Sequence, residues 1–185
     1  MPADATIFAA KYLVFIELIV ALAVVAYVLS RRSRLEMLSW AVAGGITLIL
    51  SEVFAQIGSA VYNDPRPFYV HHFHPLIAHA ADNGFPSDHA LLAAALVVFV
   101  VLIRSWVAVL IVILAVLVDW ARVGAGVHQV ADVVGSSAFV AVAALIAVLL
   151  TPLIVRWASP YLPPALTSTV SEPASSPTPD RRFGR

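Results

Sequence analysis

The feature of this sequence that most constrains its fold is a series of long apolar segments that carry almost no charge. An α-helix needs about 20 apolar residues to cross the ~30 Å hydrocarbon layer of a membrane. Of the 185 residues, 61% are hydrophobic and 12% are charged, whereas soluble domains carry about 25% charged residues. The segments that we expect to span the membrane are residues 12–29, 38–62, 89–103, 107–123 and 130–155.

Backbone inside lipid must satisfy its own hydrogen bonds, so spanning segments are helices or closed barrels. The alternation of polar and apolar residues that marks a barrel strand is absent. The sequence therefore predicts an all-α, polytopic bundle of about five transmembrane helices in residues 1–158. Residues 159–185 are rich in Pro, Ser and Thr, and we expect them to form a disordered cytoplasmic tail.

The distribution of basic residues predicts which way the helices cross, because cytoplasmic loops carry an excess of Lys and Arg. One side would hold Arg31, Arg32, Arg34, Arg104, Arg156, Arg181, Arg182 and Arg185. The other would hold only Lys11, Arg66 and Arg122. The second side is therefore expected to face outward, and it also receives every histidine of the chain.

Composition excludes several kinds of function. The chain has no cysteine, which excludes disulfides, thiol catalysis and thiolate metal sites. Its formal net charge is zero, so nothing indicates nucleic-acid binding. No feature bears on the oligomeric state. We expect membrane lipids to surround the protein, and we expect no cofactor.

Three short stretches converge on the predicted outer side and could bind an anion. Arg66 lies in Pro65-Arg66-Pro67-Phe68, Ser87 begins Ser87-Asp88-His89, and Arg122 ends the fourth segment. Two arginines can hold a phosphate with planar, permanently charged guanidinium groups. Ser87 is a candidate N-cap for the third helix, whose free N–H groups and positive dipole end favour a negative ligand.

The same stretches contain groups that suit phosphoryl transfer. His128 can act as a nucleophile, and Asp132, one helical turn later, can accept the other ring N–H and orient the imidazole. His89 remains free to protonate a leaving group and then to activate water. His128 and Asp132 alone would indicate a structural pair at a helix start, but the whole set favours chemistry.

Together these stretches resemble the motifs of the type 2 phosphatidic acid phosphatase superfamily, roughly Lys-x6-Arg-Pro, Pro-Ser-Gly-His and Ser-Arg-x5-His-x3-Asp. The run from Asp64 to Phe68, the histidine-rich loop and Phe85-Pro86-Ser87-Asp88-His89 are similar to the bacitracin-resistance-type undecaprenyl-diphosphatases. The similarity covers about residues 10–155. This resemblance implies a multi-pass cell-membrane enzyme that hydrolyses undecaprenyl diphosphate to undecaprenyl phosphate at the outer face, recycling the carrier lipid of cell-wall synthesis.

The resemblance also assigns roles to individual residues. His128 would form a phosphohistidine, Asp132 would orient it, and His89 would be the general acid and base. The phosphate would be held by Arg66, Arg122, Ser87 and the backbone at Asp88. The resemblance also implies a mechanism that needs no metal.

Three positions depart from the superfamily motifs. Ser59 stands where the motif has lysine, Asp88 where it has glycine, and Ala121 where it has serine. The first two departures are shared with the undecaprenyl branch, and all three leave His128, Asp132 and His89 in place. What replaces the lysine is open.

Several alternatives remain at this stage. The substrate could instead be phosphatidylglycerophosphate or phosphatidic acid, and the protein could be a non-catalytic lipid-phosphate binder or flippase. Tail length is undetermined. The loop histidines could form a solvated loop or a metal site, although their spacing matches no standard zinc pattern. They could also form a lid over the head group, with His71, His74 or His79 helping to bind the distal phosphate or bacitracin-like competitors. The loop histidines are His71, His72, His74 and His79.

Overall fold

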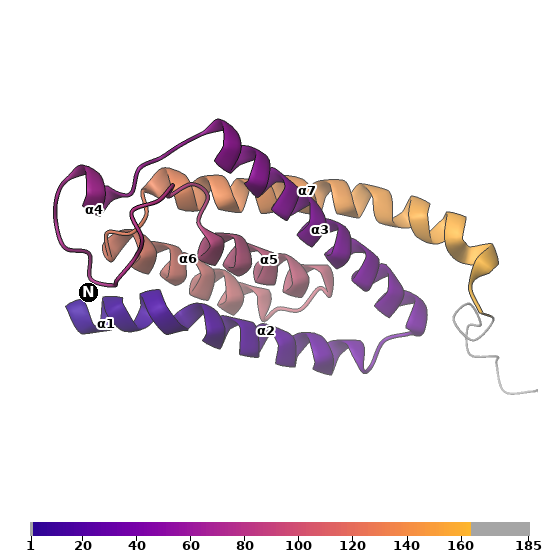
Figure 1. Ribbon diagram of the computed structural model, residues 1–185. Helices are drawn as coiled ribbons and strands as arrows, with labels where there is room; N and C mark the ends of the chain where they lie inside the picture. Colours follow the sequence, from indigo (N-terminus) through magenta and orange to yellow (C-terminus); the bar gives the residue numbers. More distant parts are fainter. Residues whose placement is uncertain (1, 164–185) are drawn as a thin grey trace, which may run out of the picture.

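The computed structural model describes residues 2–163, and in that range the protein consists of helices and connecting loops. The elements are α1 (Ala3–Phe8), the π-helical η1 (Ala9–Leu13), α2 (Val14–Leu29), α3 (Arg34–Val61), α4 (Pro67–Val70), α5 (Asp88–Leu102), α6 (Ala108–Gly124), α7 (Val130–Ala158) and the 3₁₀ helix η2 (Ser159–Tyr161). Figure 1 shows them as one elongated bundle. The expected all-α membrane bundle is thus confirmed.

Each of the five segments expected to span the membrane forms a helix, but they differ in length. Within residues 2–163, three helical stretches are long and apolar enough to cross a membrane: Ala3–Leu29, Arg34–Val61 and Val130–Tyr161. Helices α5 and α6 have 15 and 17 residues, which is shorter than the ~20 residues of a full crossing. The first helix begins at Ala3 rather than near Tyr12, because apolar length alone does not mark a helix start.

The bundle is packed through small side chains and presents large ones outward. Along α7, Ser136, Ala143 and Ala147 are fully buried, whereas Leu149 and Leu153 are each 63% exposed. Small residues at helix interfaces with large apolar residues outside are typical of helices surrounded by lipid. This arrangement supports the membrane assignment independently of segment length.

Helix α5 lies at the centre and packs against α2, α3, α6 and α7. Its inner face consists of Ala90, Ala93, Leu96 and Val100, none more than 1% exposed. These positions recur every three to four residues, as one face of a helix requires. The start of α5 is therefore held firmly against its neighbours.

One end of the bundle gathers the loops that carry the sequence motifs. Figure 1 shows α4, the long connection from α3 to α5, the turn from α6 to α7 and the N-terminus at this end. Leu76 N donates to Ala125 O at 3.0 Å, which joins the long connection to the α6–α7 turn. The motifs, which are far apart in the sequence, are thereby brought together.

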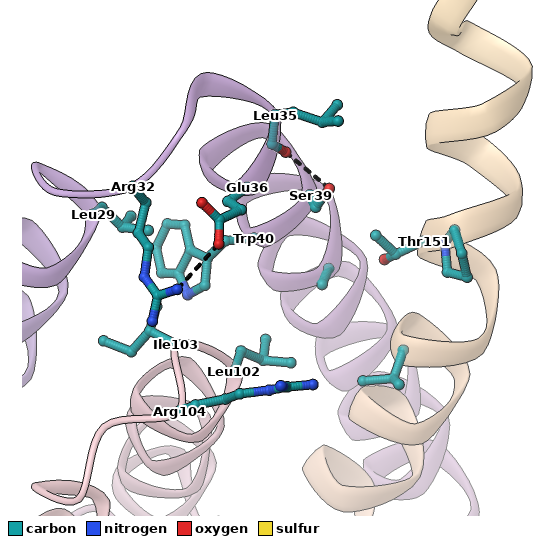
Figure 2. A pocket seen from close by; sticks show the side chains of 13 residues that line it. Leu29, Arg32, Leu35, Glu36, Ser39, Trp40, Leu102, Ile103, Arg104 and Thr151 are labelled. Carbon is teal, nitrogen blue, oxygen red and sulfur yellow. Dashed lines mark hydrogen bonds and ion pairs between the residues drawn. The ribbon is translucent and has the colours of Figure 1, made fainter. Parts of the chain in front are cut away.

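The opposite end of the bundle carries the other cluster of basic residues. Helix α3 begins there with a capping box, in which Ser33 N donates to Glu36 Oε2 at 2.9 Å. A cavity of about 550 Å³ lies beside it. Figure 2 shows Arg32 paired with Glu36 at 3.1 Å and Arg104 extending below them.

The predicted division into residues 1–158 and a tail from residue 159 stays a prediction. Helix α7 ends at Ala158 and the 3₁₀ helix η2 follows it directly. The remainder of the predicted tail, residues 164–185, lies outside the described residues.

Candidate active site

His128 is the centre of the polar cluster at the loop-rich end of the bundle. It follows the α6–α7 turn and is only 3% exposed. Its Nε2 lies 3.4 Å from Arg66 Nη1 and 3.4 Å from Arg122 Nη2. Since a guanidinium can only donate, the Nε2 that faces both arginines is the unprotonated nitrogen of the ring.

Two acceptors hold the other ring nitrogen. His128 Nδ1 lies 3.0 Å from Gly84 O and 3.2 Å from Asp132 Oδ2. Both can only accept, so Nδ1 carries the proton and the lone pair lies on Nε2. The predicted pairing of His128 with Asp132 is present, while the role of Gly84 O was not predictable because a main-chain carbonyl leaves no signal in the sequence.

Asp132 is fixed by the start of its own helix. It is fully buried, and its Oδ2 also accepts from Gln129 N at 2.8 Å, completing a capping box at the start of α7. Its Oδ1 has no hydrogen-bond partner among the described residues. The carboxylate thus connects the helix start rigidly to the His128 ring.

Arg66 is held in place by the connection between α3 and α5. Its Nε donates to Asp82 Oδ1 at 2.6 Å, and its Nη1 donates to Val127 O at 2.9 Å. The Arg66 side chain is 6% exposed, whereas that of Asp82 is 60% exposed. The hydrogen bond from Arg66 holds the pKa of Asp82 below its ordinary value. Sequence reasoning did not identify Asp82 as a partner of Arg66.

Arg122 enters the site from the last turn of α6 and is 4% exposed. Its Nη1 donates to Ala10 O at 3.2 Å, and Ala10 belongs to the π-helical η1. Its Nε has no partner within the described residues. The N-terminal helix, which none of the sequence motifs includes, therefore anchors one of the two arginines.

The start of α5 supplies the third motif. Ser87 is the N-cap residue, as predicted, but its hydroxyl makes no capping hydrogen bond. The hydroxyl is buried without a partner in the described chain, while Ser87 N donates to Ser136 Oγ at 2.8 Å. The predicted capping hydrogen bond from Ser87 is therefore absent. Ser136 of α7 holds the Ser87 backbone instead, which leaves Ser87 Oγ without a capping role.

The other two residues of this motif differ in their environments. The side chain of Asp88 is exposed, and that of His89 is half-buried. Neither side chain forms a hydrogen bond with the remaining site residues in the described range. The carboxylate of Asp88, at the position where the motif has glycine, is exposed.

His79 is distinguished from the other loop histidines by its position. Its ring lies edge-on to that of His128, with centroids 6.1 Å apart and planes at 75°. Burial, followed by the positive charge of Arg66, lowers its pKa. His71, His72 and His74 are exposed. Within residues 2–163, no three His, Asp or Glu side chains are arranged to hold a metal ion.

Ser59, at the position of the motif lysine, joins the long connection to α3. Asn83 Nδ2 donates to Ser59 O at 3.2 Å and lies 3.3 Å from Ser59 Oγ. Asn83 Oδ1 in turn accepts from Asp64 N at 2.9 Å. Position 59 therefore helps to hold the loop next to Arg66.

Fold and site together are those of a helical membrane protein with a buried histidine between two arginines. The sequence profile of the PAP2 superfamily matches residues 39–157. The chain therefore belongs to the PAP2 superfamily, as the motifs predicted.

Among curated proteins, the chain is 39% identical to undecaprenyl-diphosphatase BcrC of Bacillus subtilis (strain 168) over 92 residues, 50% of this chain and 48% of that protein. It is 30% identical to bacitracin transport permease protein BcrC of Bacillus licheniformis over 156 residues, 84% of this chain and 70% of that protein. It is also 30% identical to putative undecaprenyl-diphosphatase YbjG of Escherichia coli (strain K12) over 130 residues, 70% of this chain and 63% of that protein. The match thus spans about half the length of the first of these relatives, and no solved structure matches.

Proposed function

We propose that the protein is a membrane-embedded phosphatase that hydrolyses undecaprenyl diphosphate to undecaprenyl phosphate and phosphate. The observation that carries this proposal is the arrangement around His128, whose Nδ1 is held by two acceptors and whose Nε2 faces two arginines. Nε2 of such a ring has a free lone pair that can attack phosphorus, and the two arginines beside it can bind a phosphate. The choice of undecaprenyl diphosphate as substrate follows from the names of the relatives.

In the first step, Nε2 of His128 attacks the terminal phosphorus. The N–P bond forms while the bond from phosphorus to the bridging oxygen breaks, and the leaving lipid phosphate takes a proton from His89. Positive charge develops on the imidazole, and the buried carboxylate of Asp132 at 3.2 Å stabilises it.

In the second step, water attacks the phosphohistidine. His89, now neutral, accepts the proton of the water, the N–P bond breaks, and the lone pair returns to Nε2 as phosphate leaves. His89 is then protonated again, so the cycle is balanced. A bell-shaped dependence of rate on pH follows, because His128 must be neutral while His89 must carry a proton.

The phosphoryl oxygens would be bound by Arg66, Arg122, the hydroxyl of Ser87 and the backbone N–H of Asp88. Ser87 Oγ and Arg122 Nε are buried without partners in the described chain. Buried polar groups in proteins are nearly always hydrogen-bonded, so the two free groups are consistent with a ligand. The start of α5 adds the positive end of a helix dipole.

The site would lie at the outer face of the membrane. Arg31, Arg32 and Arg34 lie at the junction of α2 and α3, and Arg104 follows α5. Both places are at the end of the bundle opposite the site (Figure 1), and an excess of arginine marks the cytoplasmic side. Undecaprenyl diphosphate would then reach the site with its tail between lipid-facing helices, and the reaction would recycle the carrier lipid.

The test is phosphate release by purified protein in detergent with EDTA present. Undecaprenyl diphosphate, phosphatidylglycerophosphate and phosphatidic acid are compared, with His128→Ala as the inactive variant and His71→Ala, in the exposed part of the loop, as control. We expect fastest release from the diphosphate, abolished only in His128→Ala. Faster release from another lipid would reassign the substrate. No release by folded protein would replace the enzyme with a lipid-phosphate binder or flippase.

A further inference from the structure

We propose that His79 contacts the substrate and, as an additional cation of the site, binds the phosphate that remains on the lipid. This inference rests on the proposed function and extends it, because it makes the site selective for a diphosphate over a monophosphate. Nothing in the sequence motifs assigns a role to this residue.

The position of His79 is the first support. Its ring lies 6.1 Å from that of His128, centroid to centroid. The two arginines lie at Nε2 of His128, so they hold the phosphoryl group that is attacked. A second phosphate extends away from that group, and His79 is the loop histidine whose ring adjoins His128.

The charge of the site is the second support. Arg66 and Arg122 bring two positive charges, but Arg66 pairs with Asp82 and His128 pairs with Asp132. The two carboxylates therefore formally cancel the two guanidinium groups. A terminal phosphate alone carries about −1.5 to −2 at pH 7, and the second phosphate adds more. His89, which carries a proton in the proposed mechanism, adds one positive charge, and a diphosphate carries more negative charge than this single cation balances.

His79 can supply further positive charge when the substrate arrives. Burial lowers its pKa first, and the charges of Arg66 and Arg122 lower it further. Opposing these, Asp82 and a weak contact of Nδ1 with Ala80 O at 3.4 Å raise the pKa. A bound diphosphate neutralises the arginines and adds negative charge next to the ring, which favours the imidazolium.

The charged and titratable groups around His79 come from four parts of the fold: Arg66 and Asp82 in the long connection, His89 in α5, Arg122 in α6 and His128 in the α6–α7 turn. The ring nitrogens of His79 make no hydrogen bond to His128 or to its partners in the described residues. Substrate binding is therefore expected to be accompanied by uptake of a proton at His79.

The experiment compares undecaprenyl diphosphate with undecaprenyl phosphate, which has the same tail and one phosphate. Full-length wild type, His79→Gln, His79→Lys and the control His71→Gln are purified in detergent. For His79→Gln we expect kcat/KM on the diphosphate to fall about 10-fold at pH 7, the effect of one charge-assisted hydrogen bond. The fall should lie mainly in KM, with the monophosphate changed less than about 2-fold.

The remaining variants distinguish a direct contact of His79 with the substrate from a purely structural role. His79→Lys carries a permanent cation, so it should retain most of the diphosphate activity and make KM less dependent on pH between about 6 and 8. His71→Gln should match wild type. Equal losses on both lipids in His79→Gln, or no loss on either, would overturn the inference.

Binding of inorganic pyrophosphate gives a readout that does not require catalysis. Titration calorimetry in buffers of different ionisation enthalpy measures proton uptake, which we expect in wild type and in His71→Gln but not in His79→Gln. If neither lipid is hydrolysed while this difference is present, the proposed function fails and the His79 contact stands. Absence of pyrophosphate binding to wild type, or equal proton uptake in wild type and His79→Gln, overturns the inference itself.

Discussion

Replacing Asp132 by asparagine tests how the His128 ring is controlled. Asp132 Oδ2 accepts from His128 Nδ1 at 3.2 Å and from Gln129 N at 2.8 Å. An asparagine oxygen can take both bonds, and its amide nitrogen takes the place of Oδ1, which has no partner in the described chain. The geometry is therefore kept, and the main change is the loss of one negative charge.

The size of the effect follows from the second acceptor. Gly84 O lies 3.0 Å from Nδ1, so the proton stays on Nδ1 when Asp132 is neutralised. A hydrogen bond to a charged group contributes about 1.5–3 kcal/mol and one between neutral groups about 0.5–1.5 kcal/mol. The difference of about 1–2 kcal/mol lowers kcat roughly 5- to 30-fold. A change of tautomer in a catalytic triad costs about 10⁴-fold.

The assay is single-turnover release of phosphate from the lipid diphosphate, with thermal unfolding in detergent to show that the variant is folded. A loss near 10⁴-fold in a folded variant would refute the role of Gly84 O. Unchanged activity would refute the role of the Asp132 charge. Asp132→Ala also removes the capping-box acceptor for Gln129 N, so it should lose about 1 kcal/mol of stability in addition.

Three further predictions concern stability. Gly126 has φ +77°, and an added Cβ would lie 2.5 Å from Phe73 Cε2, so Gly126→Ala should cost at least about 1–2 kcal/mol; an unchanged unfolding temperature would contradict this. Both carboxylate oxygens of Glu17 are buried without a hydrogen-bond partner in the described chain. Glu17→Leu should therefore remove a desolvation penalty of about 1–3 kcal/mol and raise the unfolding temperature by about 2–4 °C per kcal/mol. A lower unfolding temperature would contradict this. The folded-state pKa of His79 lies below its ordinary value of 6.5, so below about pH 6.5 the unfolded chain binds more protons and the ligand-free protein loses stability as pH falls. Wild type should therefore lose more stability than His79→Gln between about pH 7 and 5, and parallel curves of unfolding temperature against pH would refute this.

The helices could be predicted because their signals are local. Apolar length, the basic residues between segments and the Pro and Gly in the loops are properties of neighbouring residues. Helices α3, α5, α6 and α7 begin and end within a few residues of the expected positions. The first helix was predicted less well, since its start at Ala3 involves packing of η1 against α6.

The sequence by itself determined the helical class, the superfamily and the residue types of the candidate site. Only the tertiary structure decided which atoms meet: the carbonyl of Gly84 at His128, the carbonyl of Ala10 at Arg122, and Asp82 at Arg66. It also separated His79 from the exposed loop histidines. These contacts join residues that are distant in the chain, and two of them use main-chain oxygens that every residue possesses. No pattern of side chains can encode such a contact, because it depends on how the helices and loops pack.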